Sequence, residues 1–257
     1  MKFNNINVFV SPLAKIGKNV RIGDNSIIYD NVEIGDNTII SNNCVIGEPH
    51  SEYYDNKNFI NPTTSIGSNS LIRSHCIIYS GSEIGNCFST GHRVTIRENC
   101  KIGENCRIGT LCDLQGNLTI KEYVWLHSNV HVGQSTIIQR FVFVYPYVIF
   151  TNDPRPPSNQ TFGPEIGEFT QIAVNSVVLP GVKIGTNCLI GANSLVSKTC
   201  GDYKMVIGSP GKVVKDVRDI IDENGDKLYP WPYRFERGMP WEGIGFDKWK
   251  EENDNLS

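Results

Sequence analysis

The chain has 257 residues, of which 39% are hydrophobic and 20% are charged, the composition of an ordinary soluble protein. Its formal net charge of −3 argues against a nucleic-acid-binding surface, which would carry a basic stripe. No apolar run approaches the roughly 18 residues that a membrane helix needs, and the asparagine-rich start is a poor signal peptide. We therefore expect a cytoplasmic protein that binds neither nucleic acid polymers nor membranes.

A six-residue period dominates the sequence. An apolar residue returns at every sixth position from Val10 to Ile46, from Ile66 to Phe150 and from Ile166 to Val196, interrupted by the polar Thr90. Such hexapeptide repeats are the signature of a parallel β-helix, in which each unit supplies a short strand and a turn, and stacked coils bury a shared core. The period predicts an all-β fold, with a β-helix domain over residues 1–207.

Two insertions interrupt this period, at about residues 47–65 and 151–165. Long loops on a regular scaffold are usually functional or disordered, and in repeat proteins they tend to mark the binding face. The second insertion begins with Thr151, Asn152 and Asp153 at the edge of a coil. We expect this loop to contribute to a binding site.

The period fades after Val196, and residues 208–257 form a separate C-terminal segment. The 3-to-4 spacing of its first apolar residues predicts a short amphipathic helix over Val213, Val214, Val217, Ile220 and Ile221. The tail that follows contains Trp231, Trp241 and Trp249 among prolines. Tryptophan at this density favours packing or a subunit contact over ligand stacking.

The cysteines follow the same six-residue register. Seven of the eight lie four residues after an apolar repeat position, in the slot for a small inward side chain: Cys44, Cys76, Cys100, Cys106, Cys112, Cys188 and Cys200. Cys87 is out of phase, and there is no C-x-x-C pair. Buried free thiols that pack as compact hydrophobic groups explain this pattern better than disulfides or a metal site.

Beyond the hexads, two short motifs carry a family resemblance. The ending "VIGSPGKVV" (206–214) and the loop start "FTNDPRPP" (150–157) resemble left-handed β-helix acyltransferases. They are most similar to the N-acetyltransferases that modify nucleotide-linked amino-deoxyhexoses for bacterial surface glycans such as lipopolysaccharide. The resemblance implies three hexads per coil, a left-handed sense, a homotrimer with active sites between subunits, and acetyl-CoA as donor. It also implies a dTDP-linked 3-amino-3,6-dideoxyhexose as acceptor.

With 18 residues per coil, positions 18 apart would stack at about 4.8 Å, the spacing of neighbouring strands. His131 lies between the inward-pointing Val130 and Val132, so strand alternation directs it outward, and Asp113 lies one coil below it. An outward histidine with a neighbouring carboxylate is a general base with an orienting partner. His127, in the same coil, is the second candidate base.

These residues belong to a predicted polar strip, in which Asn129, His92 and Arg93 are candidates for substrate binding. The strip comprises His75, His92, Arg93, Asp113, His127, Asn129 and His131. By the family resemblance, Asn152 and Asp153 would hold the sugar near its amine. For acetyl-CoA, the small Ala173 and Ala192 are candidates to line a groove for pantetheine, and Lys198 and Lys212 are candidates to bind its phosphates.

The proposed chemistry needs a proton acceptor, because an amino sugar arrives largely protonated and must lose a proton before it attacks a thioester. A neutral imidazole, with an ordinary pKa near 6.5, can take that proton at neutral pH. The departing coenzyme A thiolate is the alternative acceptor, so the sequence leaves the identity of the base open.

Three other readings stay open at this point. A UDP-linked amino sugar or an O-acetyl transfer would fit the same fold. A zinc enzyme like the γ-class carbonic anhydrases would need three converging histidines, but His92 and His127 are 35 residues apart, one short of two full coils, and we expect no metal. A non-catalytic β-helix scaffold is the remaining reading.

Overall fold

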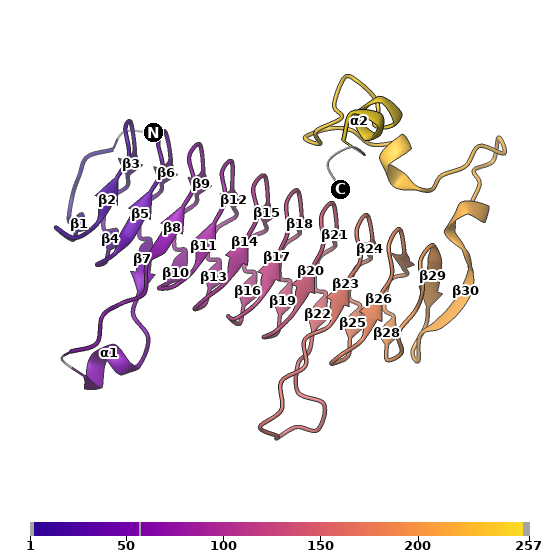
Figure 1. Cartoon of the computed structure of the whole chain (residues 1–257), viewed down its shortest axis with the longest axis horizontal. Coiled ribbons are helices and arrows are strands. Elements are labelled where there is room, and N and C mark those ends of the chain that lie inside the picture. Colours follow the sequence, from indigo (N-terminus) through magenta and orange to yellow (C-terminus); the bar gives the residue numbers. More distant parts are fainter. Residues whose placement is uncertain (1–2, 57, 254–257) are drawn as a thin grey trace.

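The computed structural model describes residues 3–56 and 58–253, and three parallel sheets wind through them as a left-handed β-helix (Figure 1). Sheet A contains β1 (Phe9–Val10), β4 (Ile27–Ile28), β7 (Val45–Glu48), β10 (Ile77–Tyr79), β13 (Thr95–Ile96), β16 (Asp113–Leu114), β19 (His131–Val132), β22 (Ile149–Phe150), β25 (Val177–Val178) and β28 (Leu195–Val196). The predicted all-β repeat fold is confirmed.

The other two faces are built in the same way. Sheet B contains β2 (Lys15–Ile16), β5 (Val32–Ile34), β8 (Thr64–Ile66), β11 (Glu83–Ile84), β14 (Lys101–Ile102), β17 (Thr119–Ile120), β20 (Ile137–Ile138), β23 (Glu165–Ile166) and β26 (Lys183–Ile184). Sheet C contains β3 (Arg21–Ile22), β6 (Ile39–Ile40), β9 (Leu71–Ile72), β12 (Ser89–Thr90), β15 (Arg107–Ile108), β18 (Trp125–Leu126), β21 (Phe143–Val144), β24 (Gln171–Ile172), β27 (Leu189–Ile190), β29 (Lys204–Ile207) and β30 (Lys212–Asp216).

The strand register gives three hexads per coil. Asp113 pairs with His131, and Leu114 pairs with Val132, 18 residues further along the chain. From β4 onward, the second residue of every two-residue strand is buried, because it points into the prism, whereas the first points outward. Even Thr90 is 4% exposed, and its hydroxyl accepts a hydrogen bond from the Arg73 amide at 2.9 Å. The seven in-phase cysteines are buried and Cys87 is exposed, as the register predicts.

Both insertions leave the prism at the edge between sheets A and B. The first lies between β7 and β8 and contains α1 (Glu52–Asp55), and the second lies between β22 and β23. In Figure 1 the two loops extend to the same side of the β-helix, with several coils between them. This arrangement leaves the intervening stretch of sheet A flanked by a loop at each end.

The predicted amphipathic helix at Val213–Ile221 is wrong. Val213 and Val214 belong to β30, which pairs antiparallel with β29, and only a short 3-10 helix (Val217–Asp219) follows. The β-branched valines fit an extended edge strand, and this strand caps the last coil of sheet C. The real α-helix of this segment is α2 (Phe246–Asn253), after a 3-10 helix at Trp231–Tyr233. Within the described part of the chain, no helix has the length and apolar character that a bilayer crossing requires.

The aromatic tail folds back over sheet C instead of extending away from it (Figure 1). Together with outward side chains of the β-helix it forms a second apolar core, called here the aromatic cluster: Trp125, Phe141, Phe143, Trp231, Met239 and Trp241. The ring of Phe143 on β21 contacts that of Trp231 with centroids 4.8 Å apart, and the Trp231 indole N–H donates to the Phe169 carbonyl at 2.8 Å. The tail therefore packs on the outer face of the middle coils of sheet C.

Trp231→Ala is expected to release this tail while leaving the coils folded. Removing a buried tryptophan costs about 3–5 kcal/mol, and here that loss falls on the contact between tail and β-helix. Limited proteolysis should cleave the variant within residues 208–257 and leave a resistant β-helix. Tyr233→Ala, which changes an exposed ring of the same segment, is the matched control and should keep the tail protected. Equal protection of both variants would contradict this packing.

Candidate active site

Asp113 and His131 contact each other on the outer face of sheet A. Their strands, β16 and β19, are adjacent, and the His131 Nδ1 atom lies 3.2 Å from the Asp113 Oδ2 atom. Because an ionised carboxylate only accepts hydrogen bonds, Nδ1 carries the proton and the opposite ring nitrogen, Nε2, is left as an acceptor. The two side chains are 41% and 39% exposed, so a ligand can reach them.

Gln115 is a third member of this group, which the sequence analysis did not identify. Its side-chain amide donates to Asp113 Oδ2 at 2.6 Å. The hydrogen bonds from His131 and from Gln115 hold the pKa of Asp113 below its ordinary value, because both stabilise the ionised carboxylate. The signal that could have revealed it is strand alternation, since residues 113 and 115 point to the same face.

Gln115→Leu tests this contact. Loss of the amide donor should raise the pKa of Asp113 towards its ordinary value and lower turnover several-fold through a less constrained His131. An NMR titration of the Asp113 carboxyl group, alongside steady-state rates, would detect both changes. Gln171→Leu, on the outer face of sheet C, is the control. An unshifted Asp113 titration in Gln115→Leu would show that the amide does not act on this carboxylate.

His127 lies in the turn from sheet C to sheet A, four residues before His131. Its ring stacks on Tyr145 of the next coil, with centroids 4.8 Å apart and planes at 10°. Burial lowers the pKa of His127, because the charged imidazolium is poorly solvated there. The structure thus gives His127 an aromatic partner and His131 a carboxylate partner, which favours His131 as the base.

Asn152 of the second insertion borders the same coil as His131. A Cβ atom placed on Gly133 would lie 3.2 Å from the Asn152 Cβ atom and 2.8 Å from the Phe150 carbonyl oxygen, so a glycine is needed for this close approach. Asp153 instead stabilises its own loop: its carboxylate accepts from the Arg155 amide at 2.9 Å and from the Ser158 amide at 2.8 Å. These bonds, with that from the Ser158 hydroxyl, lower the pKa of Asp153.

The predicted polar strip is not continuous. His75, Arg93 and Asn129 occupy the same corner of three C-to-A turns, each with a left-handed backbone. Leu111, between Arg93 and Asn129, takes that corner in the intervening coil and is 50% exposed. His92 is also engaged locally, with its Nδ1 atom 2.8 Å from the Ser74 hydroxyl. Asn129 therefore stays beside His127 and His131, whereas His75, His92 and Arg93 lie two or three coils towards the N-terminus.

The candidate residues for the acyl donor lie in the coils on the C-terminal side of His127, whereas His75, His92 and Arg93 lie on its N-terminal side. Strand pairing stacks Tyr145 on His127, and then Ala173 and Gly191 above them, so small side chains follow the aromatic pair along this edge. Ala192 adjoins Gly191 and is exposed. Lys198, after β28, and Lys212, at the start of β30, are exposed near the last coils.

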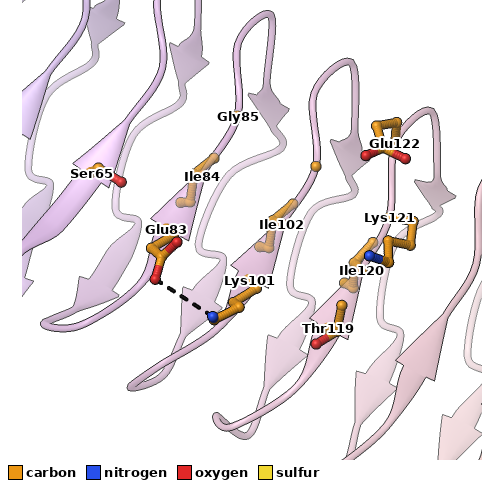
Figure 2. Close-up of a pocket in the computed structure, with 11 residues that line it drawn as sticks. Ser65, Glu83, Ile84, Gly85, Lys101, Ile102, Thr119, Ile120, Lys121 and Glu122 are labelled. Carbon is orange, nitrogen blue, oxygen red and sulfur yellow. Dashed lines mark ion pairs between the residues drawn. The ribbon is translucent and has the colours of Figure 1, made fainter.

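A shallow groove of about 390 Å³ on sheet B is a different kind of surface (Figure 2). Figure 2 shows Lys101 directed towards Glu83, at 3.8 Å, beside Thr119 and Lys121. Similar pairs, Lys15–Glu33 and Lys183–Glu165, continue along this face. Exposed ladders of alternating charge are typical of a solvated surface, and the groove holds no imidazole or thiol, so we do not place the active site there.

Metal chemistry was one of the alternative readings. In the described residues, no group of three or more histidine, cysteine, aspartate or glutamate side chains is arranged to hold a metal ion.

Comparisons with known proteins agree with the repeat fold. Residues 13–48 and 163–198 match the family of the bacterial transferase hexapeptide (six repeats). The chain is 30% identical over 112 residues to the putative lipopolysaccharide biosynthesis O-acetyl transferase WbbJ of Escherichia coli K12, covering 38% of this chain and 57% of that protein. It is 44% identical over 86 residues to a serine acetyltransferase of Staphylococcus epidermidis, covering 34% of this chain and 39% of that protein.

Among solved structures, the UDP-N-acetylglucosamine acyltransferase from Campylobacter jejuni superposes with a TM-score of 0.48 at 15% identity, covering 85% of this chain and 78% of that one. The chain matches only part of the length of these two curated relatives, 57% of the E. coli protein and 39% of the S. epidermidis protein.

Proposed function

We propose that the protein is an acetyl-CoA-dependent N-acetyltransferase whose acceptor is a nucleotide-linked amino-deoxysugar used for bacterial surface glycans. The observation that supports this most is the His131–Asp113–Gln115 constellation, exposed on sheet A between two loop insertions. The match to transferase hexapeptide repeats and the acetyltransferase relatives support acyl transfer as the reaction class. By resemblance, the preferred acceptor is a dTDP-linked 3-amino-3,6-dideoxyhexose.

In the proposed mechanism, the sugar ammonium first loses one proton to solvent, and His131 Nε2 takes a second proton from the sugar nitrogen as the neutral amine attacks the thioester carbonyl. Asp113 holds the imidazole in the tautomer that leaves Nε2 free and stabilises the imidazolium that forms. When the C–S bond breaks, the imidazolium can return a proton to the leaving thiolate. Asn152 would orient the acceptor, and the edge lined by Ala173 and Ala192 would admit the pantetheine arm, with Lys198 and Lys212 near its phosphates.

We also propose that the protein acts as a homotrimer through sheet A. The outward position of sheet A is apolar in most coils: Phe9, Ile27, Val45, Ile77, Ile149, Val177 and Leu195. Sheet B is largely charged and the tail covers the middle coils of sheet C, so sheet A is the longest apolar face that lacks an intramolecular cover in the described chain. A uniform apolar face on a soluble protein marks a protein contact, and Thr95, Asp113 and His131 interrupt it where the site would adjoin a neighbouring subunit.

The test is a thiol-release assay with acetyl-CoA against dTDP- and UDP-linked amino sugars and their hydroxyl counterparts. Release that requires an amino sugar supports N-acetylation. Faster release with a hydroxyl counterpart would favour O-acetylation, the activity named for the E. coli relative. No release with any nucleotide sugar would contradict the proposal.

A further inference from the structure

A second pocket lies where the first insertion folds back on the β-helix. It has a volume of about 500 Å³ and is lined on the loop side by Glu48, His50 and Tyr54, and on the coil side by Tyr79, Arg97 and Glu98. His50 anchors the loop, since its Nε2 atom lies 3.2 Å from the Ser80 carbonyl oxygen. The Ser80 hydroxyl beneath it is buried with no hydrogen-bond partner within the described structure.

The pocket lies on the same edge of the prism as the candidate active site. Tyr79 ends β10, and Arg97, Gln115 and Gly133 directly follow β13, β16 and β19 in the next three coils, so the four residues form one column. At about 4.8 Å per coil, Arg97 is roughly 10 Å from the coil of His131. The positive charge of Arg97 contributes to the lowered pKa of Asp113, which agrees with this proximity. An elongated acceptor could therefore span both places.

The chemistry of the pocket suits a neutral planar group with its own donors and acceptors. Arg97 donates to both Glu98 oxygens, at 3.0 and 3.1 Å, and its guanidinium lies over the Tyr79 ring, 5.6 Å from the centroid. The Tyr54 hydroxyl donates to Glu48 at 3.1 Å. The carboxylates of Glu48, Glu52 and Glu98 outnumber Arg97, so the local field disfavours a phosphate. Flat surfaces and side chains that both donate and accept fit a heterocyclic base.

We propose that this pocket binds the nucleoside of the acceptor, an inference that rests on the proposed nucleotide-sugar substrate. The base packs against Tyr54 and the Arg97–Tyr79 stack, and its polar edge meets Arg97 and Glu98. The first insertion is then the element that distinguishes a nucleotide-linked amino sugar from the free sugar, while His131 acts on the amine further along the column.

The test compares Tyr54→Ala with Tyr53→Ala, a neighbouring exposed tyrosine that does not line the pocket. Loss of one base–aromatic contact, about 1–3 kcal/mol, should raise the KM for the nucleotide-linked acceptor by about fivefold to about 150-fold. The kcat, the KM for acetyl-CoA and the rate with the free amino sugar should not change. Tyr53→Ala should behave like wild type. An equal loss with free and nucleotide-linked sugars, or in both variants, would overturn the assignment.

Calorimetry with thymidine diphosphate and uridine diphosphate separates this inference from the proposed function. If wild type transfers no acetyl group to any sugar, the function fails, yet nucleotide binding that Tyr54→Ala weakens and Tyr53→Ala does not would still support the pocket. If wild type acetylates a nucleotide-linked sugar but Tyr54→Ala has the same KM and the same affinity for both nucleotides, the function stands and the nucleoside assignment is wrong.

Discussion

His131→Ala is expected to lower kcat by about two orders of magnitude, the typical contribution of a positioned general base. The variant removes Nε2, the proposed proton acceptor. Asp113 then keeps its hydrogen bond from Gln115 but loses its contact with the imidazole. Folding should be unaffected, because the ring lies on the outer face of β19, whereas Val132 forms the core contact. Steady-state rates at saturating acetyl-CoA and acceptor would measure the loss.

His75→Ala is the control for this variant, because His75 is also an exposed histidine of the β-helix but lies three coils from His131. It should retain wild-type turnover. Unchanged turnover in His131→Ala would remove His131 as the base and leave the coenzyme A thiolate as the proton acceptor. A loss in His127→Ala with none in His131→Ala would move the role to the Tyr145-stacked ring.

Ile149→Asp is expected to dissociate the trimer and abolish activity. Ile149 lies on the apolar outer face of sheet A, one strand from His131, and is 40% exposed in the isolated chain, so a charge there would be buried among the apolar residues of the subunit contact. Light scattering after size-exclusion chromatography would show a fall from three chains to one. Activity should fall with it if the site needs a neighbouring subunit.

The matched control is Ile137→Asp, which changes an isoleucine of similar exposure, 38%, on the charged face of sheet B. This variant should remain trimeric and active, because that face is solvated. A monomeric wild type, or dissociation by Ile137→Asp instead of Ile149→Asp, would contradict an interface through sheet A.

The repeat register was predictable from the sequence because every coil obeys the same constraint. An apolar residue every six positions must point inward, so the outward direction of His131 follows from counting, and its stacking on Asp113 follows once the family resemblance supplies three hexads per coil. The same counting explains the buried cysteines. Periodicity was sufficient wherever the backbone repeats without interruption.

Features that depend on single side chains or on non-repeating segments could not be obtained in this way. Leu111 is an exception, because the same counting places it between Arg93 and Asn129, so its interruption of the polar strip could have been predicted. Val213 and Val214 fit both a helix and an edge strand, and only the free edge of β29 decides between them. The pocket at the first insertion depends on how a loop without a period folds back, and no spacing rule describes that.

The most direct test of the account is the product of a single reaction that contains the protein, acetyl-CoA and a dTDP-linked amino-deoxyhexose. Mass spectrometry should detect the acetyl group on the sugar nitrogen, in an amount equal to the free thiol released, and His131→Ala should form far less of both. Thiol release that does not depend on the amino sugar, or an acetyl group found on oxygen, would contradict the proposed N-acetyl transfer.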